Sequence, residues 1–229
     1  MTPLVLLPGL MCDARLWAPQ EAAISDRDVI HGDITRADTI EAIATQVLAD
    51  APVSFALAGL SMGGIVAMEI VRQAPQRVER LALLDTNALA ERPEVASLRT
   101  PQIAAARAGN LQGVLRDELK PNYLVESPKK ASIMDLCMSM GLDLGPEVFE
   151  RQSRALATRR DQQDTLRGYD APALVLMGRY DKLCPRDRHE LMHDLLPNSR
   201  FVIVDNAGHL PTVEQPDATT TAMLDWLLA

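Results

Sequence analysis

The segment Gly59–Gly63 reads GLSMG and has the pattern GxSxG, which can present a serine for nucleophilic attack. It follows an apolar segment with strand character, Val53–Ala58, and precedes a segment with helical spacing, Gly64–Gln73. A serine at such a tight strand-to-helix turn has a strained backbone and an exposed hydroxyl, and flanking glycines leave room for the turn. The context therefore predicts Ser61 as a nucleophile. The alternative, a glycine-rich loop whose serine caps a helix, accounts for fewer of these features.

A serine nucleophile needs a base and an acid that orients the base. Among the four histidines, His209 follows the apolar segment Phe201–Val204 and precedes the last helical segment. Asp181 follows the apolar segment Ala173–Met177 in the same way. Since Ser61, Asp181 and His209 each follow an expected strand, we expect all three at the carboxyl edge of one parallel sheet. Their chain order, serine then aspartate then histidine, is that of one known fold.

The elements around these residues alternate between strand and helix patterns. The expected strands are nearly all apolar, which indicates burial on both faces of a parallel sheet covered by helices. They are Leu4–Leu7, Val53–Ala58, Leu81–Leu84, Ala173–Met177 and Phe201–Val204. The expected helices around them are Asp38–Asp50, Gly64–Gln73, Arg186–Leu196 and Glu214–Leu228.

Residues 86–170 interrupt this alternation, because they contain no convincing strand. Their helical patterns lie at Val95–Arg107, Ala131–Met140 and Pro146–Thr158. We therefore expect one α/β domain over residues 1–229, with a helical insertion at 86–170.

Composition narrows the function classes. The chain has 229 residues, of which 47% are apolar and 24% charged, as in a folded globular protein. Its net charge of −8 disfavours nucleic acid and anionic membranes as partners, and 3% aromatic residues offer few rings for stacking bases. No apolar stretch is long enough for a membrane span, and no leader pattern is seen. Three widely spaced cysteines, Cys12, Cys137 and Cys184, fit reduced thiols in a cytoplasm.

A second motif points to different chemistry. Residues His189–His193 read HELMH, which matches the zinc metalloprotease pattern HExxH, and Glu214 is at a plausible separation for a third ligand. The expected helix is short, however, and the two histidines border its apolar stripe, so we interpret it as an ordinary surface helix.

Two further groups have open interpretations. Met134, Met138 and Met140 in the insertion either line an adaptable acyl pocket or simply pack helices, and the pattern favours neither. Cys12 and Cys184 follow loops expected near the site, where we interpret them as packing residues.

In combination these motifs resemble the α/β-hydrolase superfamily, specifically its small capped serine hydrolases of the carboxylesterase-like type. The resemblance covers nearly the whole chain. The matching pieces are Leu6–Leu10 with Trp17 downstream, Gly59–Gly64, Gly178–Asp181 with Pro185, and Gly208–His209 followed by Glu214–Pro216. The resemblance implies a helical cap inserted after the sixth strand of an eight-stranded type of sheet, where residues 86–170 lie.

The chain also departs from the family pattern. Members usually have two strands before the one expected at Leu4–Leu7, so we expect about six strands and an exposed sheet edge on which a homodimer could form. Pro8 stands where members commonly have histidine. The resemblance implies oxyanion donors at the backbone amides of Leu10 and Met62, which do not depend on side chains. Some members place the acid after the preceding strand, which makes Asp85 the alternative to Asp181.

The resemblance implies a serine hydrolase that acts on a small carboxylic ester, thioester or lactone through an acyl-enzyme, with no metal or cofactor. Ser61 excludes the aspartate nucleophile of dehalogenases and epoxide hydrolases. Two alternatives stay open at this point. One is a C–C bond hydrolase or lyase that uses the same triad, and the other is a slow or non-catalytic small-molecule receptor or partner-binding member of the fold.

Overall fold

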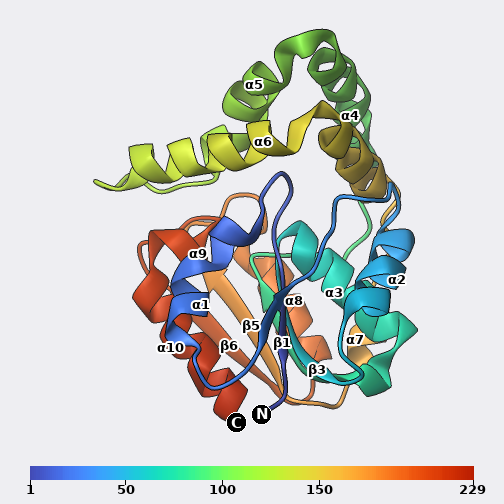
Figure 1. Ribbon diagram of the computed structural model, residues 1–229, viewed down its shortest axis with the longest axis vertical. Helices are drawn as coiled ribbons and strands as arrows, with labels where there is room; N and C mark the ends of the chain where they lie inside the picture. The colour runs from blue at the N-terminus through green and yellow to red at the C-terminus, as the bar shows by residue number, and fades with distance from the viewer.

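The computed structural model describes residues 1–229 and contains one sheet of six parallel strands (Figure 1). The strands are β1 (Leu4–Leu7), β2 (Val29–His31), β3 (Phe55–Leu60), β4 (Val78–Leu84), β5 (Ala173–Gly178) and β6 (Ser199–Val204). Their order in the sheet is β2-β1-β3-β4-β5-β6. The predicted parallel sheet of about six strands is thus confirmed. Its edge strand β2 was missed, because three half-buried residues carry no apolar run.

Helices connect the strands and cover both faces of the sheet (Figure 1). Those that pack on the sheet are α1 (Ala18–Ala23), α2 (Ile40–Asp50), α3 (Met62–Gln73), α7 (Gln163–Arg167), α8 (Arg186–Leu195), α9 (Pro211–Glu214) and α10 (Pro216–Leu228). The predicted final helix Glu214–Leu228 begins two residues later, at Pro216, because the chain leaves helical geometry at Gln215, and the short helix α9 precedes it. No helix combines the length and apolar character needed to cross a membrane.

Alternating side chains of the strands enter two separate cores. In β3, Phe55 and Leu57 belong to the core that the sheet forms with α2, α3, α7 and α8. Ala56 and Ala58 face the other way, into the core formed with α10 and the helical turn that contains the fully buried Trp17. Burial of apolar surface on both faces explains why these strands are almost free of polar residues.

The helical insertion lies between β4 and β5 and sits across the carboxyl edge of the sheet, which is the upper end in Figure 1. Its main helices, α4 (Pro93–Ala105), α5 (Leu111–Gly113) and α6 (Lys130–Ala157), are called the cap here together with the segments that connect them. Gly145, at φ +81°, breaks α6 ahead of Pro146, so the two predicted helices form one interrupted helix. A small apolar cluster of the cap includes Met11, which comes from the loop after β1.

Candidate active site

Ser61 occupies the turn between β3 and α3, at φ 54° and ψ −115°, a backbone conformation that non-glycine residues rarely adopt. The turn is tight enough that a Cβ on Gly59 would collide with the backbone of Gly63, and a Cβ on Gly63 would collide with the carbonyl of Leu7. The Ser61 amide donates to the carbonyl of Leu84 at 2.9 Å, which ties the turn to β4. The neighbouring backbone therefore maintains the strained conformation of this serine.

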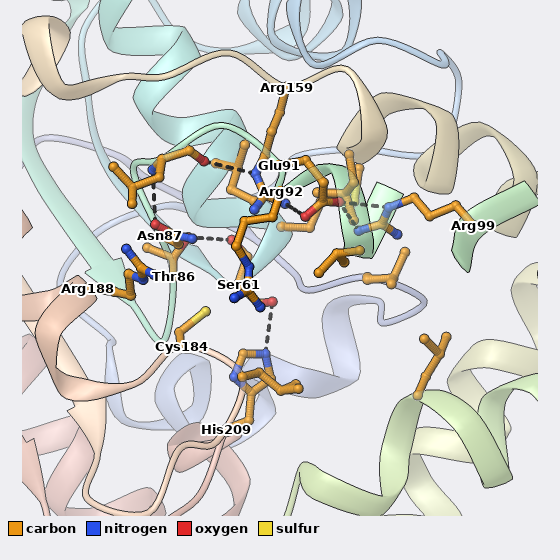
Figure 2. Close-up of a pocket in the computed structure, with 18 of the residues that line it drawn as sticks. Ser61, Thr86, Asn87, Glu91, Arg92, Arg99, Arg159, Cys184, Arg188 and His209 are labelled. Atoms are coloured by element: carbon orange, nitrogen blue, oxygen red, sulfur yellow. Dashed lines mark hydrogen bonds and ion pairs between the residues drawn. The ribbon is translucent and has the colours of Figure 1, made fainter. Parts of the chain in front are cut away.

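His209 and Asp181 meet Ser61 at the edge where the sequence placed them. His209 Nε2 lies 2.9 Å from Ser61 Oγ, a contact drawn in Figure 2. On the other side of the ring, Nδ1 lies 2.9 Å from Asp181 Oδ2. The second oxygen of Asp181 accepts from the amides of Leu183 at 2.8 Å and Cys184 at 3.1 Å. The three side chains thus form a continuous hydrogen-bonded series from carboxylate to hydroxyl.

The pKa values of the two aspartates at this edge are shifted in opposite directions. Burial alone would raise the pKa of Asp181, but the charge and hydrogen bond of His209, with the two backbone amides, bring it below the ordinary value. Burial raises the pKa of Asp85 well above its usual range, and the charge of Asp181 raises it further. Asp85 Oδ1 accepts from the amide of Gly178 at 2.9 Å, while Oδ2 has no hydrogen-bond partner in the protein. Burial thus favours the neutral form of Asp85, and His209 bonds to Asp181.

The loop that carries His209 is fastened by groups that sequence reasoning did not assign to the site. The buried carboxylate of Glu214 accepts from the amides of Gly208 at 2.9 Å and Leu210 at 3.1 Å, on either side of the histidine. The His209 amide donates to the carbonyl of Tyr123 at 2.7 Å, and the two rings meet edge to face at 5.1 Å. Since Tyr123 belongs to the cap, the cap contacts the histidine loop directly.

The amides of Leu10 and Met62 border the same space as Ser61. Leu10 makes no backbone or side-chain hydrogen bond through its amide, and Met62 is the first residue of α3, where amides lack partners inside the helix. Gly9 brings the β1 loop close to the serine, because a Cβ there would lie 3.5 Å from that of Ser61. Leu10 and Met62 thus line the same cavity as Ser61, the position that the sequence comparison with the family implied for oxyanion donors.

Above these groups, a cavity of about 550 Å³ opens between the core and the cap. Its floor contains Ser61, His209, Leu10 and Met62. Figure 2 shows four arginines around the serine, Arg92, Arg99 and Arg159 from the cap side and Arg188 from α8. No motif marks these arginines, and Arg159 and Arg188 are far in sequence from Arg92 and Arg99, so no pattern in the sequence groups the four.

The HELMH segment does not assemble a zinc site with Glu214. His193 Nδ1 bonds to Ser199 Oγ at 2.7 Å, and Glu214 is engaged with backbone amides. The expectation that both histidines border the apolar stripe was wrong for His189, which is fully buried. Burial lowers the pKa of His189 to about 4, so its ring is neutral, and side-chain atoms of His189, Asp85 and Asp181 lie within 4.8 Å of one another.

The structure also places the methionines and cysteines whose roles the sequence left open. Met134, Met138 and Met140 pack in the apolar clusters and do not line the cavity, which favours their structural interpretation. Cys184 does line the cavity, and burial raises the pKa of its thiol, so the reactive thiolate is disfavoured. Cys12 is buried in the core, where its pKa is raised in the same way.

Comparison with known proteins agrees with this fold. A family model described as the alpha/beta hydrolase family matches residues 4–222. The chain belongs to the alpha/beta hydrolase family, and it is a hydrolase.

Curated relatives include pimeloyl-[acyl-carrier protein] methyl ester esterases. The esterase of Legionella pneumophila (strain Corby) is 24% identical and aligns over 98% of this chain and 95% of its own length. That of Neisseria meningitidis serogroup C is 26% identical over 86% of this chain and 79% of its own.

Solved structures give the same assignment. A thermophilic esterase from Thermogutta terrifontis, solved with malate bound, has a TM-score of 0.90 and 30% identity, and covers 99% of this chain and 89% of that one. The enol-lactonase from Burkholderia xenovorans LB400 has a TM-score of 0.87 and 24% identity, with coverage of 100% and 92%. The enol-lactonase supports the fold, while the esterase also supports the family.

Proposed function

We propose that the protein is a serine esterase that cleaves a small carboxylic ester through an acyl-enzyme on Ser61. His209 takes the hydroxyl proton as Ser61 attacks the ester carbonyl, and Asp181 keeps the imidazole in the tautomer that accepts this proton. The amides of Leu10 and Met62 stabilise the oxyanion, and such a donor typically contributes about 3 to 4 kcal/mol. His209 then returns the proton to the leaving alcohol and activates the water that releases the acid.

The observation that carries this proposal is the hydrogen-bonded series Ser61–His209–Asp181 with its two 2.9 Å contacts at the histidine. Ser61 is half-buried, lines the cavity, and has the strained backbone that is typical of a nucleophile at this kind of turn. Asp85, whose pKa is raised by burial, bonds to the amide of Gly178 and makes no hydrogen bond to His209. Backbone groups supply the rest of the machinery, so the proposed mechanism requires no side chain beyond these three.

The relatives narrow the ester class. The pimeloyl-[acyl-carrier protein] methyl ester esterases remove a methyl group from an acyl chain, according to their names. We therefore propose that the leaving alcohol is small and that the cavity receives the acyl chain. Thioesters and lactones are attacked in the same way, so they serve as comparison substrates when turnover is measured.

The first test is labelling with a fluorophosphonate, read by intact mass on the wild type and on Ser61→Ala. We expect one adduct on the wild type and none on the variant, because only an activated serine is phosphonylated. A series of p-nitrophenyl esters then measures turnover. A folded wild type that neither labels nor hydrolyses any ester would contradict the proposal. A protein that labels but turns over only once would favour the slow receptor.

A further inference from the structure

The cavity above Ser61 has the opposite charge to the rest of the molecule. The whole chain carries a net charge of −8. The cavity is nevertheless lined by five cationic side chains, namely Arg92, Arg99, Arg159, Lys182 and Arg188. Only two acidic residues, Glu91 and Glu118, line it as well. A cationic cavity in an acidic protein attracts anions selectively and excludes cations.

The most buried of these charges form a cluster with unequal numbers of cations and anions. Arg99 and Arg159 both pair with Glu91, whose side chain is only 4% exposed. Arg99 Nε lies 2.8 Å from Glu91 Oε2, and Arg159 Nη1 lies 2.8 Å from Oε1. Two guanidinium groups that are about nine-tenths buried thus share one carboxylate. Burial lowers the pKa of Arg159, as expected for a cation that is only partly compensated.

The other cations have even less compensation inside the cavity. Arg188 pairs only with the adjacent Asp187, at 3.6 Å. Arg92 and Lys182 take part in no ion pair or side-chain hydrogen bond. Glu118 accepts a hydrogen bond from Gln102 at 3.1 Å rather than from an arginine. The cavity therefore contains guanidinium groups with free donors and an excess of positive charge.

We propose that the substrate ester carries a carboxylate, which the Arg99–Arg159 cluster and Arg188 bind while the ester lies at Ser61. The substrate class is thus a half-ester of a dicarboxylic acid. This inference rests on the proposed esterase function, because it concerns the second end of the same substrate.

The chemistry of the cluster favours a single carboxylate. A guanidinium binds a carboxylate through two parallel hydrogen bonds, and low local polarity strengthens such bonds. If one carboxylate of the substrate is added, the two guanidinium groups of the cluster pair with two carboxylates, that of Glu91 and that of the substrate. A phosphate monoester carries nearly two charges at neutral pH, which exceeds the single uncompensated charge of the two arginines and Glu91. Because the arginines come from the cap and α8 while Ser61 lies on the floor, one elongated molecule would contact both.

The kinetic test uses methyl half-esters of dicarboxylic acids from succinate to pimelate. Each is compared with the matching methyl ester that bears a carboxamide in place of the carboxylate, and released methanol is measured. We expect kcat/KM to favour the carboxylate over the carboxamide by about tenfold or more at the best chain length, the value of one charge-assisted hydrogen bond. Equal rates for each pair along the series would overturn the inference.

Variants test the assignment of residues. We expect Arg159→Gln and Arg188→Gln each to lower kcat/KM for the half-ester by about tenfold and to leave the carboxamide ester nearly unchanged. Glu91→Gln should act in the opposite direction, because it frees both guanidinium groups for the substrate. Arg116→Gln removes an exposed cap arginine that lies outside the cavity and is the matched control. Loss of activity on both members of a pair would indicate structural damage, which the circular dichroism melting curve of each variant checks.

A binding measurement separates failure of this inference from failure of the proposed function. Calorimetry on Ser61→Ala with free glutarate, adipate or pimelate reads carboxylate binding without any turnover. Binding that disappears in the double variant with Arg159→Gln supports the inference even if no ester is hydrolysed. If esters are hydrolysed without dicarboxylate binding and without a preference for half-esters, the carboxylate inference is overturned and the proposed esterase function stands. Preferential binding of a phosphate monoester would overturn the carboxylate assignment.

Discussion

The floor and the roof of the cavity are built by different means. On the floor, Ser61 and the proposed oxyanion amides are positioned by backbone geometry, and the charge of Asp181 is fully engaged by His209 and two amides. The roof, which is formed by the cavity arginines Arg92, Arg99, Arg159 and Arg188, presents long side chains. Two of them, Arg99 and Arg159, share a single carboxylate. A rigid floor suits chemistry, which tolerates little displacement, whereas an adaptable charged roof suits selection of the substrate.

The difference extends to packing. The two cores beside the sheet contain most of the buried apolar residues, while the cap has only a small cluster of its own. The insertion that contains the cap depends on polar contacts as well, such as that between Arg159 Nε and the carbonyl of Leu89 at 3.1 Å. We therefore expect substitutions on the floor to abolish activity or folding, and substitutions in the cap to alter selectivity or to have small effects.

The largest expected effect distinguishes the two buried aspartates. Asp181→Asn should lower kcat about 10⁴-fold, because an amide cannot hold the imidazole in its useful tautomer. Asp85→Asn should change kcat less than about threefold, because burial favours the neutral form of this acid and an amide is uncharged as well. Single-turnover kinetics on a p-nitrophenyl ester compares the pair. A similar loss in both variants would show that Asp85 takes part in the proton transfer.

The next effect concerns the rigidity of the floor. Gly63→Ala should lower the free energy of unfolding by about 3 kcal/mol or more, since its Cβ would collide with the Leu7 carbonyl. Gly168→Ala is the control, because its Cβ would meet only ordinary contacts at 3.7 Å. Urea denaturation measures both. A neutral Gly63→Ala would show that the turn can relax and is less constrained than its geometry indicates.

A third prediction uses pH and concerns the buried His189, which lies close to Asp85 and Asp181. His189 is neutral in the fold, with its pKa lowered from 6.5 to about 4 by burial. As the pH falls below about 6.5 the unfolded chain takes up a proton that the folded one refuses, so stability falls until about pH 4. The loss attributable to His189 should approach about 3 kcal/mol. His189→Gln should flatten this part of the stability curve, while His31→Gln, on the partly exposed edge strand, should retain it.

The smallest expected effect lies in the cap. Gly109 has φ +94° with open space around it, so Gly109→Ala should cost only about 1 kcal/mol of backbone strain. Thermal unfolding should shift slightly, and kcat/KM for a neutral ester should not change. A loss of activity comparable with that of a floor variant would remove the distinction between the two regions.

The sequence predicted the floor far better than the roof, for a physical reason. Ser61, Asp181 and His209 each follow an apolar strand, and parallel strands bring such positions to one edge whatever the rest of the chain does. The arginines of the cavity meet only because helices far apart in sequence pack together. Arg159, for example, bonds to Leu89, 70 positions away. No short-range pattern records such a contact.

The burial of individual polar side chains was the other property that the sequence did not determine. The helical spacing of α8 was predicted well, yet the full burial of His189 depends on what packs against that helix. The neutral state of Asp85 has the same origin, because it requires both burial and the nearby charge of Asp181. The short edge strand β2 was missed for a related reason, since it is half-exposed and pairs with β1 on one side only.

The contact between Tyr123 and His209 limits how this scaffold can be re-engineered. A cap transplanted as one cassette from another protein would remove the carbonyl to which the His209 amide donates. It would also replace Val125, whose backbone amide donates a hydrogen bond to Glu214 at 2.9 Å. A graft that exchanges residues 93–119 and retains 120–126 would keep these bonds. The stretch from Lys120 to Glu126 therefore belongs functionally with the core, although the chain places it inside the cap.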